Sequence, residues 1–411
     1  MARGIAFEAA NSLCGIASDR ALQKGHGMLT NADLVELTEF RRKLHRFPEI
    51  SGEEHDTARA IAAALEQLPG AHVMRGIGGH GVAAVFEGKE AGPTVLFRAE
   101  LDALPIAEIS EATWRSAIPG KGHLCGHDGH MTMLLALGRL IAREPIAKGR
   151  AVLMFQPAEE DGSGARAVVR DPAFAKIAPD WAFAIHNLPG RVFGEVGLRP
   201  GLINCASQGL EIRLAGKTAH AATPEDGISP VQAVGQLVAA LADLGRGGAR
   251  LDDDFRLLTI THVRIGEPTF GISPGDAVLH ATLRTGSDAA MDDLAREARD
   301  LVAELAERQR LAVSIEPRDD FAASINDPEA TEIARSALDA VGVSHGETDL
   351  PMRASEDFGV FGQTAKAAML LLGSGERHAA LHNPDYDFPD DLLPLGARIF
   401  ERIARDLLGR A

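Results

Sequence analysis

The sequence contains little cysteine, no long apolar run and fewer basic than acidic residues. Its three cysteines, Cys14, Cys125 and Cys205, are too few and too odd in number for a disulfide framework, and they indicate a reducing compartment. No apolar run reaches the roughly 18 residues that a membrane span requires, and the first thirty residues lack the pattern of a secretory signal. With 42 basic against 58 acidic residues, the chain lacks the basic stripe of a nucleic-acid-binding protein. We therefore expect a cytoplasmic protein that binds neither membrane nor nucleic acid.

Most of the chain has the pattern of an α/β fold. Short apolar runs bounded by glycine, proline or charge predict strands covered on both faces, at residues 94–99, 151–156, 181–185 and 367–372. Apolar residues at three-to-four spacing predict helices at 34–46, 57–68 and 131–141. A chain of 411 residues is too long for one ordinary core. We therefore expect a catalytic α/β domain with a mixed central sheet and a second domain.

Between residues 208 and 317 the rhythm changes to strand, helix, two strands, helix, strand. This order is that of the split β-α-β sandwich and predicts an inserted ferredoxin-like α+β domain. The α/β pattern resumes after it. The predicted organisation is an N-terminal extension at 1–30, a catalytic domain at 31–207 and 318–411, and the inserted domain at 208–317.

A loop ahead of a predicted helix is rich in groups that bind metals. It reads HLCGHDGH from His123, and the thiolate of Cys125 and the imidazole of His127 can both point at one cation. Such ligands suit zinc and related transition metals. Asp128 and His130 can orient the ligands instead of binding the metal themselves. The alternative is a polar loop with a buried cysteine and a helix-capping Asp128.

Two adjacent carboxylates, Glu159 and Glu160, follow the strand at 151–156. The carboxyl ends of strands are where α/β folds place their sites. Because successive side chains diverge, one can bind a metal while the other acts as a general base. The alternative is a solvated surface pair.

Three histidines, an acidic pair and an arginine complete the candidate residues. His186 ends the strand at 181–185 and His382 lies in the stretch LHNPDYDF, although either could be a structural histidine. Glu356 and Asp357 open a helical turn, where capping is the simpler interpretation. In the inserted region, His220 is flanked by small residues that permit close approach to a ligand or partner, or it lies in a simple turn. Arg284 is a candidate carboxylate clamp, or a surface charge.

The order of these motifs resembles the di-metal amidohydrolase branch of the aminoacylase and carboxypeptidase-type metallopeptidases. This branch includes hippurate hydrolases and hydrolases of indole-acetyl amino acid conjugates. The resemblance spans residues 34–405 and rests on these stretches: RRKLHRFPEISGEE from Arg41, RAELDALPIAE from Arg98, HLCGHDGH from His123, FQPAEEDGSGA from Phe155, HNLPG from His186, GKTAHAATPEDGISP from Gly216, SEDF from Ser355 and LHNPDYDF from Leu381.

The resemblance implies a role for each candidate residue. Two divalent metals are expected, manganese or zinc first, with cobalt or nickel as alternatives. The implied assignments are Cys125 as the bridging ligand, His127 and His186 on one metal, Glu160 and His382 on the other, Glu159 as general base and Asp102 as an orienting carboxylate. The inserted domain is implied to act as lid and dimer interface, in a homodimer or a tetramer, with His220 reaching the partner's active site.

Two positions depart from the pattern of the family. Gly271 stands where an asparagine normally helps to hold the substrate near its carboxylate, and Glu100 stands where an aspartate is usual. The first hypothesis is a hydrolase of N-acyl or N-aroyl amino acids. The alternative is an aminohydrolase acting on an aromatic amine such as a substituted aminobenzoate, which Gly271 would suit better. A dipeptidase and a non-catalytic metal-binding protein are the remaining hypotheses.

Overall fold

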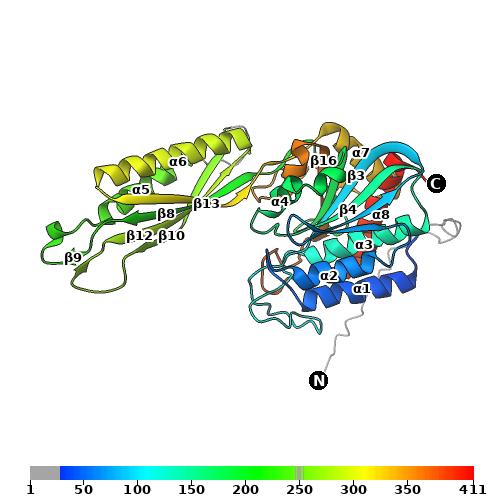
Figure 1. Cartoon of the computed structure of the whole chain (residues 1–411), viewed down its shortest axis with the longest axis horizontal. Helices are drawn as coiled ribbons and strands as arrows, with labels where there is room; N and C mark the ends of the chain where they lie inside the picture. Colours follow the sequence, from blue (N-terminus) through cyan, green and yellow to red (C-terminus); the bar gives the residue numbers. More distant parts are fainter. Residues whose placement is uncertain (1–27, 246, 248–250, 253) are drawn as a thin grey trace, which may run out of the picture.

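The computed structural model describes residues 28–245, 247, 251–252 and 254–411. Most of the expected N-terminal extension, residues 1–27 with Cys14, lies outside the described residues, and the first helix begins at Asn31. The described chain forms a larger unit that contains both termini of the fold and a smaller unit that extends away from it (Figure 1).

The larger unit is built on an eight-stranded mixed sheet. In spatial order its strands are β1 (His72–Ile77), β2 (Gly81–Glu87), β4 (Lys148–Gln156), β3 (Glu90–Glu100), β5 (Trp181–Pro189), β16 (Lys366–Gly375), β6 (Val196–Gly197) and β15 (His345–Gly346). The four predicted strands are the central ones, and β4, β3, β5 and β16 run parallel to one another. Their carboxyl ends therefore meet at one edge. The mixed central sheet is confirmed.

Helices cover both faces of this sheet. One face packs against α1 (Asn31–Arg46), α2 (His55–Leu65), α3 (His127–Arg143), α7 (Pro328–Val341) and α8 (Leu393–Leu408). The other packs against α4 (Gly164–Arg170) and the short 3-10 helices η1 (Phe174–Lys176) and η3 (Asp357–Gln363). A fourth such turn, η4 (Asp390–Leu392), leads into α8.

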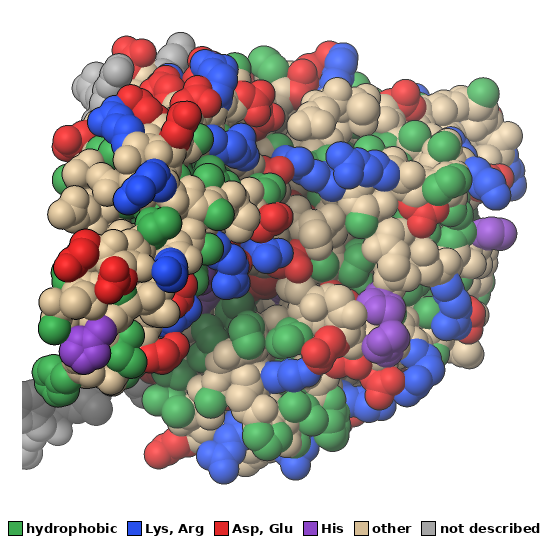
Figure 2. All heavy atoms as spheres, turned by 60° about the vertical axis from the view of Figure 1, so that its left-hand side comes forward, with side chains coloured by type: hydrophobic (Ala, Val, Ile, Leu, Met, Phe, Trp, Pro, Cys, Tyr) green, Lys and Arg blue, Asp and Glu red, His purple; other side chains and the backbone are tan. Residues whose placement is uncertain are grey.

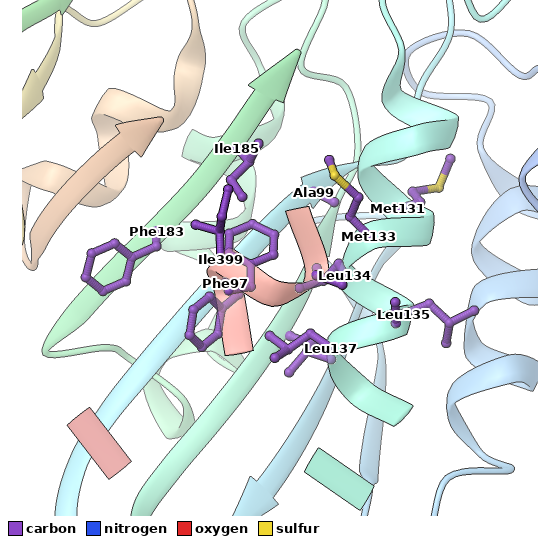
Figure 3. Packing of buried hydrophobic residues seen from close by; sticks show 14 of the residues in the cluster. Phe97, Ala99, Met131, Met133, Leu134, Leu135, Leu137, Phe183, Ile185 and Ile399 are labelled. Carbon is purple, nitrogen blue, oxygen red and sulfur yellow. The ribbon is translucent and has the colours of Figure 1, made fainter. Parts of the chain in front are cut away.

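Successive side chains of a β-strand point to opposite faces of the sheet, so the residues of the central strands belong alternately to the two cores. Phe97 and Phe183 belong to the core on the α3 and α8 side, together with Leu134 of α3 and Ile399 of α8 (Figure 3), whereas Leu96 and Ala182 join the opposite core. The central strands are therefore apolar on both faces, which made them recognisable as continuous apolar runs.

The smaller unit is a four-stranded antiparallel sheet with two helices on one face. Its elements are β8 (Ala206–Ala215), α5 (Val231–Leu244), β10 (Arg256–Ile265), β12 (Asp276–Thr285), α6 (Asp288–Arg308) and β13 (Ala312–Phe321). The spatial order is β10-β12-β8-β13. Leu210, Ile212 and Leu214 of β8 pack beneath both helices, and no helix of the described residues covers the opposite face of the sheet.

Several elements were not predicted from the sequence. They are the β1–β2 hairpin, helices α4, α7 and α8, the pair β7 (Gly201–Asn204) and β14 (Ser324–Asn326), and the ribbon of β9 (Ala219–His220) and β11 (Ile272–Ser273). A short turn, η2 (Pro224–Asp226), follows β9. The ribbon lies at the end of the smaller unit farthest from the larger one (Figure 1). In the described part of the chain, no helix is long and apolar enough to cross a membrane. Basic and acidic side chains are interspersed over the face shown in Figure 2.

Candidate metal centre and substrate pocket

The carboxyl ends of the parallel strands bring the candidate ligands together from distant parts of the sequence. Asp102 follows β3, Glu159 and Glu160 follow β4, His186 lies near the end of β5, and His382 follows β16. Cys125 and His127 join them from the loop that opens α3. The residues thus come from the ends of four strands and from one loop, and the sheet fixes their common position.

Two groups of three potential ligands share one thiol. In the first group, Cys125, His127 and His186 offer ligand atoms that all lie within 4.8 Å of one another. In the second, Cys125, Glu160 and His382 do the same. These are the two sets that the family resemblance implied for two metals, with Cys125 common to both. His127, Glu159 and Glu160 form a further close group, so Glu159 stands beside the predicted ligands.

Hydrogen bonds orient both buried imidazoles towards the centre. His127 Nδ1 lies 2.9 Å from the carbonyl oxygen of Asp102, and His186 Nδ1 lies 2.7 Å from that of Asn187. Because a carbonyl oxygen only accepts, each Nδ1 carries the proton and each Nε2 keeps its lone pair. His186 Nε2 faces Cys125 Sγ at 3.4 Å, and His127 Nε2 lies 3.8 Å from Glu160 Oε1. Both rings therefore present a free ligand atom to the same space.

The arrangement fits cations at this position. His127 Nε2 and Glu160 Oε1 are buried without a hydrogen-bond partner among the described residues. Burial, with repulsion from the neighbouring carboxylates, raises the pKa values of the Cys125 thiol and the Glu159 carboxyl well above their usual ranges. Burial also raises the pKa of Glu160 to about 7. So many acidic groups in one buried place are stabilised in their ionised forms only by positive charge.

His382 differs from the other candidate ligands because it is accessible. Its side chain is 50% exposed, and its Nε2 lies 3.5 Å from Glu160 Oε2. The residue has a φ of 65°, a left-handed conformation that is uncommon for residues other than glycine. Its backbone N–H donates to the carbonyl oxygen of Leu124 at 2.8 Å, which ties it to the cysteine loop. The strained turn thus holds His382 at the open side of the centre.

Asn187 is a residue that the sequence analysis passed over, although it connects several parts of the centre. Its amide Nδ2 donates to the carbonyl oxygen of Cys125 at 2.6 Å, and its Oδ1 accepts from the hydroxyl of Tyr386. Its backbone N–H donates to His130 Nε2 at 3.0 Å. The loop packs so closely here that a Cβ at Gly126 would lie 2.4 Å from Asn187 Nδ2. The only signal in the sequence was its position directly after His186.

Glu100, one of the two departures, lies behind the centre. His130 Nε2 accepts a hydrogen bond from the backbone N–H of Asn187, so the single proton of the neutral ring is on Nδ1, which donates to Glu100 Oε2 at 2.7 Å. Glu100 also pairs with the fully buried Arg98. Burial keeps the pKa of His130 well below its usual value, consistent with a neutral ring. Glu100 therefore does not face the cavity but holds His130 at the start of α3, behind the candidate ligands.

The acidic pair after residue 355 has both a capping and an electrostatic role. Glu356 accepts a hydrogen bond from the backbone of Phe358, which is the capping interaction that the sequence suggested. Glu356 and Asp357 also form ion pairs with Arg98, at 2.8 and 2.6 Å. Glu356 lines the same pocket as Glu159, and its charge contributes to the raised pKa of Glu159.

Two further carboxylates hold the turn that carries Glu159 and Glu160. Asp102 Oδ2 accepts from the Glu160 backbone at 2.9 Å and from the Ser51 hydroxyl at 2.7 Å. Glu54 Oε1 accepts from the backbone of Ala158 at 2.8 Å, and Ala158 has a φ of 50°. The stretch ISGEE before α2 thus supports the turn that positions Glu159, a contact that only the fold reveals.

A cavity of about 460 Å³ opens beside the centre and is lined by both units. Cys125, Glu159 and His382 lie on the side of the larger unit, and Arg284 and Phe321 on the side of the smaller one. Arg284 Nη1 donates to the Ser355 hydroxyl at 2.6 Å and to the Arg353 carbonyl at 2.8 Å. Within the described ranges no carboxylate pairs with Arg284, so its guanidinium remains available to an anion.

His220 and Gly271 are the predicted site residues that lie away from both the centre and this cavity. They lie together on the β9–β11 ribbon, where the Ala221 backbone donates to the Gly271 carbonyl at 3.0 Å and His220 pairs with Ile272. His220 is exposed, and the ribbon is at the far end of the smaller unit (Figure 1). Gly271 therefore accompanies His220 rather than Arg284. Its φ of +78° suits glycine, and a Cβ there would meet no atom within 4 Å.

Comparisons with known proteins agree with this arrangement. Residues 96–406 match the sequence model of peptidase family M20/M25/M40. The chain is 30% identical over 379 residues to a Campylobacter jejuni hippurate hydrolase, covering 90% of this chain and 96% of the relative. It is 32% identical to the IAA-amino acid hydrolase ILR1-like 2 of Arabidopsis thaliana, covering 90% and 84%. A crystal structure of a Bacillus subtilis protein, described as a dinuclear metal binding peptidase of the M20 family, matches with a TM-score of 0.76 at 25% identity, covering 93% and 100%.

Proposed function

Because the chain belongs to peptidase family M20/M25/M40, we propose that it hydrolyses the amide bond of N-acyl or N-aroyl amino acids with a two-metal centre. The observation that carries the proposal is the pair of ligand groups that share Cys125 beside Glu159, next to a cavity whose Arg284 forms no ion pair with any described carboxylate. The relatives named hippurate hydrolase and IAA-amino acid hydrolase support a substrate of this class.

The predicted ligands divide between two divalent metals. Cys125, His127 and His186 would hold one, and Cys125, Glu160 and His382 the other. A bound divalent metal lowers the pKa of water towards neutrality and acts as a Lewis acid on a carbonyl oxygen. A thiolate with imidazole and carboxylate ligands suits zinc or manganese, with cobalt or nickel as alternatives.

Glu159 is the proposed proton carrier. Its carboxylate lies 3.8 Å from His127 Nε2, next to the ligands but outside the two groups proposed for the metals. Burial and the neighbouring acidic groups raise its pKa, so it can accept a proton from water and keep it long enough to deliver it to the departing nitrogen. The ion pair of Arg98 with Glu356 lies beside it; the charge of Glu356 raises the pKa of Glu159, and the charge of Arg98 opposes that rise.

Arg284 is the proposed clamp for the carboxylate of the leaving amino acid. Guanidinium matches carboxylate geometry, and the bonds to Ser355 and to the Arg353 carbonyl hold its planar group in the cavity. Burial lowers the pKa of Arg284, but the ordinary pKa of a guanidinium is so high that the side chain remains charged at neutral pH.

The exposed ribbon is proposed to complete the active site of a second copy. In this arrangement the smaller unit is a ferredoxin-like dimerisation domain and lid, and the partner's His220 stabilises the oxyanion while domain closure excludes water. The position of His220 far from its own cavity supports a homodimer, or a tetramer built from such dimers. The two buried free thiols, Cys125 and Cys205, support a cytoplasmic location.

The test is a metal-replete turnover screen followed by mass spectrometry. It pairs N-acetyl, N-benzoyl and indole-acetyl amino acids with amino-substituted benzoates, with Glu159→Ala as the blank. Release of a free amino acid is expected. Release of ammonia from the aromatic amines alone would overturn the proposal in favour of an aminohydrolase, an alternative that the relatives do not favour.

A further inference from the structure

A β-bulge lies where β13 enters the cavity. Gly209 of β8 pairs with Arg318, and Ser207, two residues earlier, pairs with Phe321, three residues later. One extra residue is therefore inserted into β13. Asp319 within the bulge has a φ of 44°, a left-handed conformation that is unfavourable for a residue other than glycine. Bulges of this kind re-aim side chains and are common beside active sites.

The bulge decides which side chains face the substrate. On β13, Glu316 and Arg318 pair with Glu211 and Gly209 on the face of the sheet that carries no helix. Strict alternation would turn Phe321 to the helix-covered face. The inserted residue instead pairs Phe321 with Ser207, and both Phe321 and Asp319 line the cavity.

Asp319 differs from its neighbour Asp320 in its ion pairing. Its neighbour Asp320 forms an ion pair with Arg166 at 2.7 Å, whereas Asp319 forms none with any described residue. Partial burial and the charge of Asp161 raise the pKa of Asp319 against the opposing charge of Arg318, so a further cation beside the carboxylate would be favourable. Arg284 lines the same cavity and, conversely, is a cation that forms no ion pair with any described carboxylate.

The sheet fixes the spacing between these two charges. Arg284 pairs with Ser207 across β12 and β8, and Ser207 pairs with Phe321 across β8 and β13. Two interstrand distances, roughly 10 Å, therefore separate the strand that bears Arg284 from the strand that bears Asp319. Phe321 offers an apolar surface near Asp319, suitable for a methylene chain.

We propose that Asp319 is a specificity-determining residue, which selects substrates whose leaving amino acid carries a second, cationic amino group. Arg284 binds the carboxylate of that amino acid, and Asp319 binds the ammonium group at the end of its side chain. The inference deepens the proposed function and depends on it. The substrate class is thus the N-acyl derivatives of basic or diamino acids.

The test compares two substrates with the same carbon skeleton. These are Nα-acetyl-lysine and Nα-acetyl-norleucine, the second of which lacks the ammonium group. The metal-loaded wild-type protein should have the higher kcat/KM on the lysine derivative. Asp319→Asn should lower that value about fivefold, as expected for a partly exposed ion pair, and leave the norleucine value unchanged. Glu316→Gln removes a carboxylate from the same strand outside the cavity and should change neither.

The kinetic constants distinguish recognition from a structural effect. Because the ammonium group lies away from the reacting amide, the loss should appear in KM rather than in kcat. Equal losses on both substrates, or a wild-type protein without preference for lysine, would overturn the role of Asp319 while the amidohydrolase remained. A wild-type protein that releases no amino acid from any N-acyl substrate would overturn the proposed function, and the inference with it.

Discussion

Replacing His45 by glutamine should remove a pH-dependent part of the stability of this protein. His45 lies on α1 with a fully buried side chain between two carboxylates, 2.9 Å from Asp128 Oδ2 and 3.2 Å from Glu108 Oε1. Burial disfavours the charged ring, but Asp128 and Glu108 outweigh it and raise the pKa of His45 to about 10. Both ring nitrogens therefore donate, and the residue is an imidazolium at neutral pH.

The magnitude and its sign follow from linkage. A rise from 6.5 to about 10 corresponds to at most roughly 5 kcal/mol of stability. Below pH 6.5 the folded and unfolded states both carry the proton, so the full contribution is present. As the pH rises towards 10, only the folded state keeps the proton, and the contribution falls by about 1.4 kcal/mol per pH unit. It is lost above the pKa of the folded state.

The assay is urea unfolding of the wild-type protein and His45→Gln, from about pH 6 to about pH 9. The metal ligands titrate in both proteins, so the difference between their free energies of unfolding isolates His45. That difference should be largest at the acidic end and shrink steadily with pH. His72→Gln, which changes an exposed histidine on β1, should show no such trend. A difference between wild type and His45→Gln that stays level across this range would refute the reasoning.

The remaining predictions concern the centre itself. Cys125→Ala should lower the number of metal ions per chain measured by mass spectrometry, and an unchanged ratio would contradict the bridging role. Mixing inactive Glu159→Ala and His220→Ala chains should restore part of the activity, and a verified mixed dimer without activity would contradict catalysis across the interface. Glu54→Ala leaves the buried Ala158 N–H unpaired, so it should lower both kcat and the free energy of unfolding, the latter by about 1–3 kcal/mol. Glu54→Gln keeps an acceptor oxygen and should recover most of both losses; equal defects in the two variants would argue against this hydrogen bond.

The regular elements were predictable where one period dominated the sequence. The central strands appeared as apolar runs because both of their faces are buried, and β8, β10, β12 and β13 appeared by alternation because one face is open. The β1–β2 hairpin was missed. Its first strand, β1, lies at the edge of the sheet and is mostly exposed, so its residues lack a clear apolar period. It is recognisable only in the folded protein, where β1 pairs with β2 and β2 pairs with β4.

The candidate site was only partly visible in the sequence. Cys125, His127 and Glu159 were recognisable because groups that bind metals or protons cluster there within a few residues. Asn187 and Glu54 carried no such signal, since an amide or a carboxylate gains its role from the atom it happens to face. The bulge at Asp319 was equally hidden, because its register is defined by pairing with β8 rather than by its own residues.

The sequence by itself determined the chemistry of the ligands and the identity of the main elements, because side-chain type and apolar period are local properties. The tertiary structure alone decided which groups meet. Strand ends from residue 100 to residue 375 converge at one edge because β4, β3, β5 and β16 run parallel. The same folding carries His220 away from its own cavity, to the tip of a separate sheet. Both outcomes depend on hydrogen bonds between strands far apart in the chain, which no local pattern specifies.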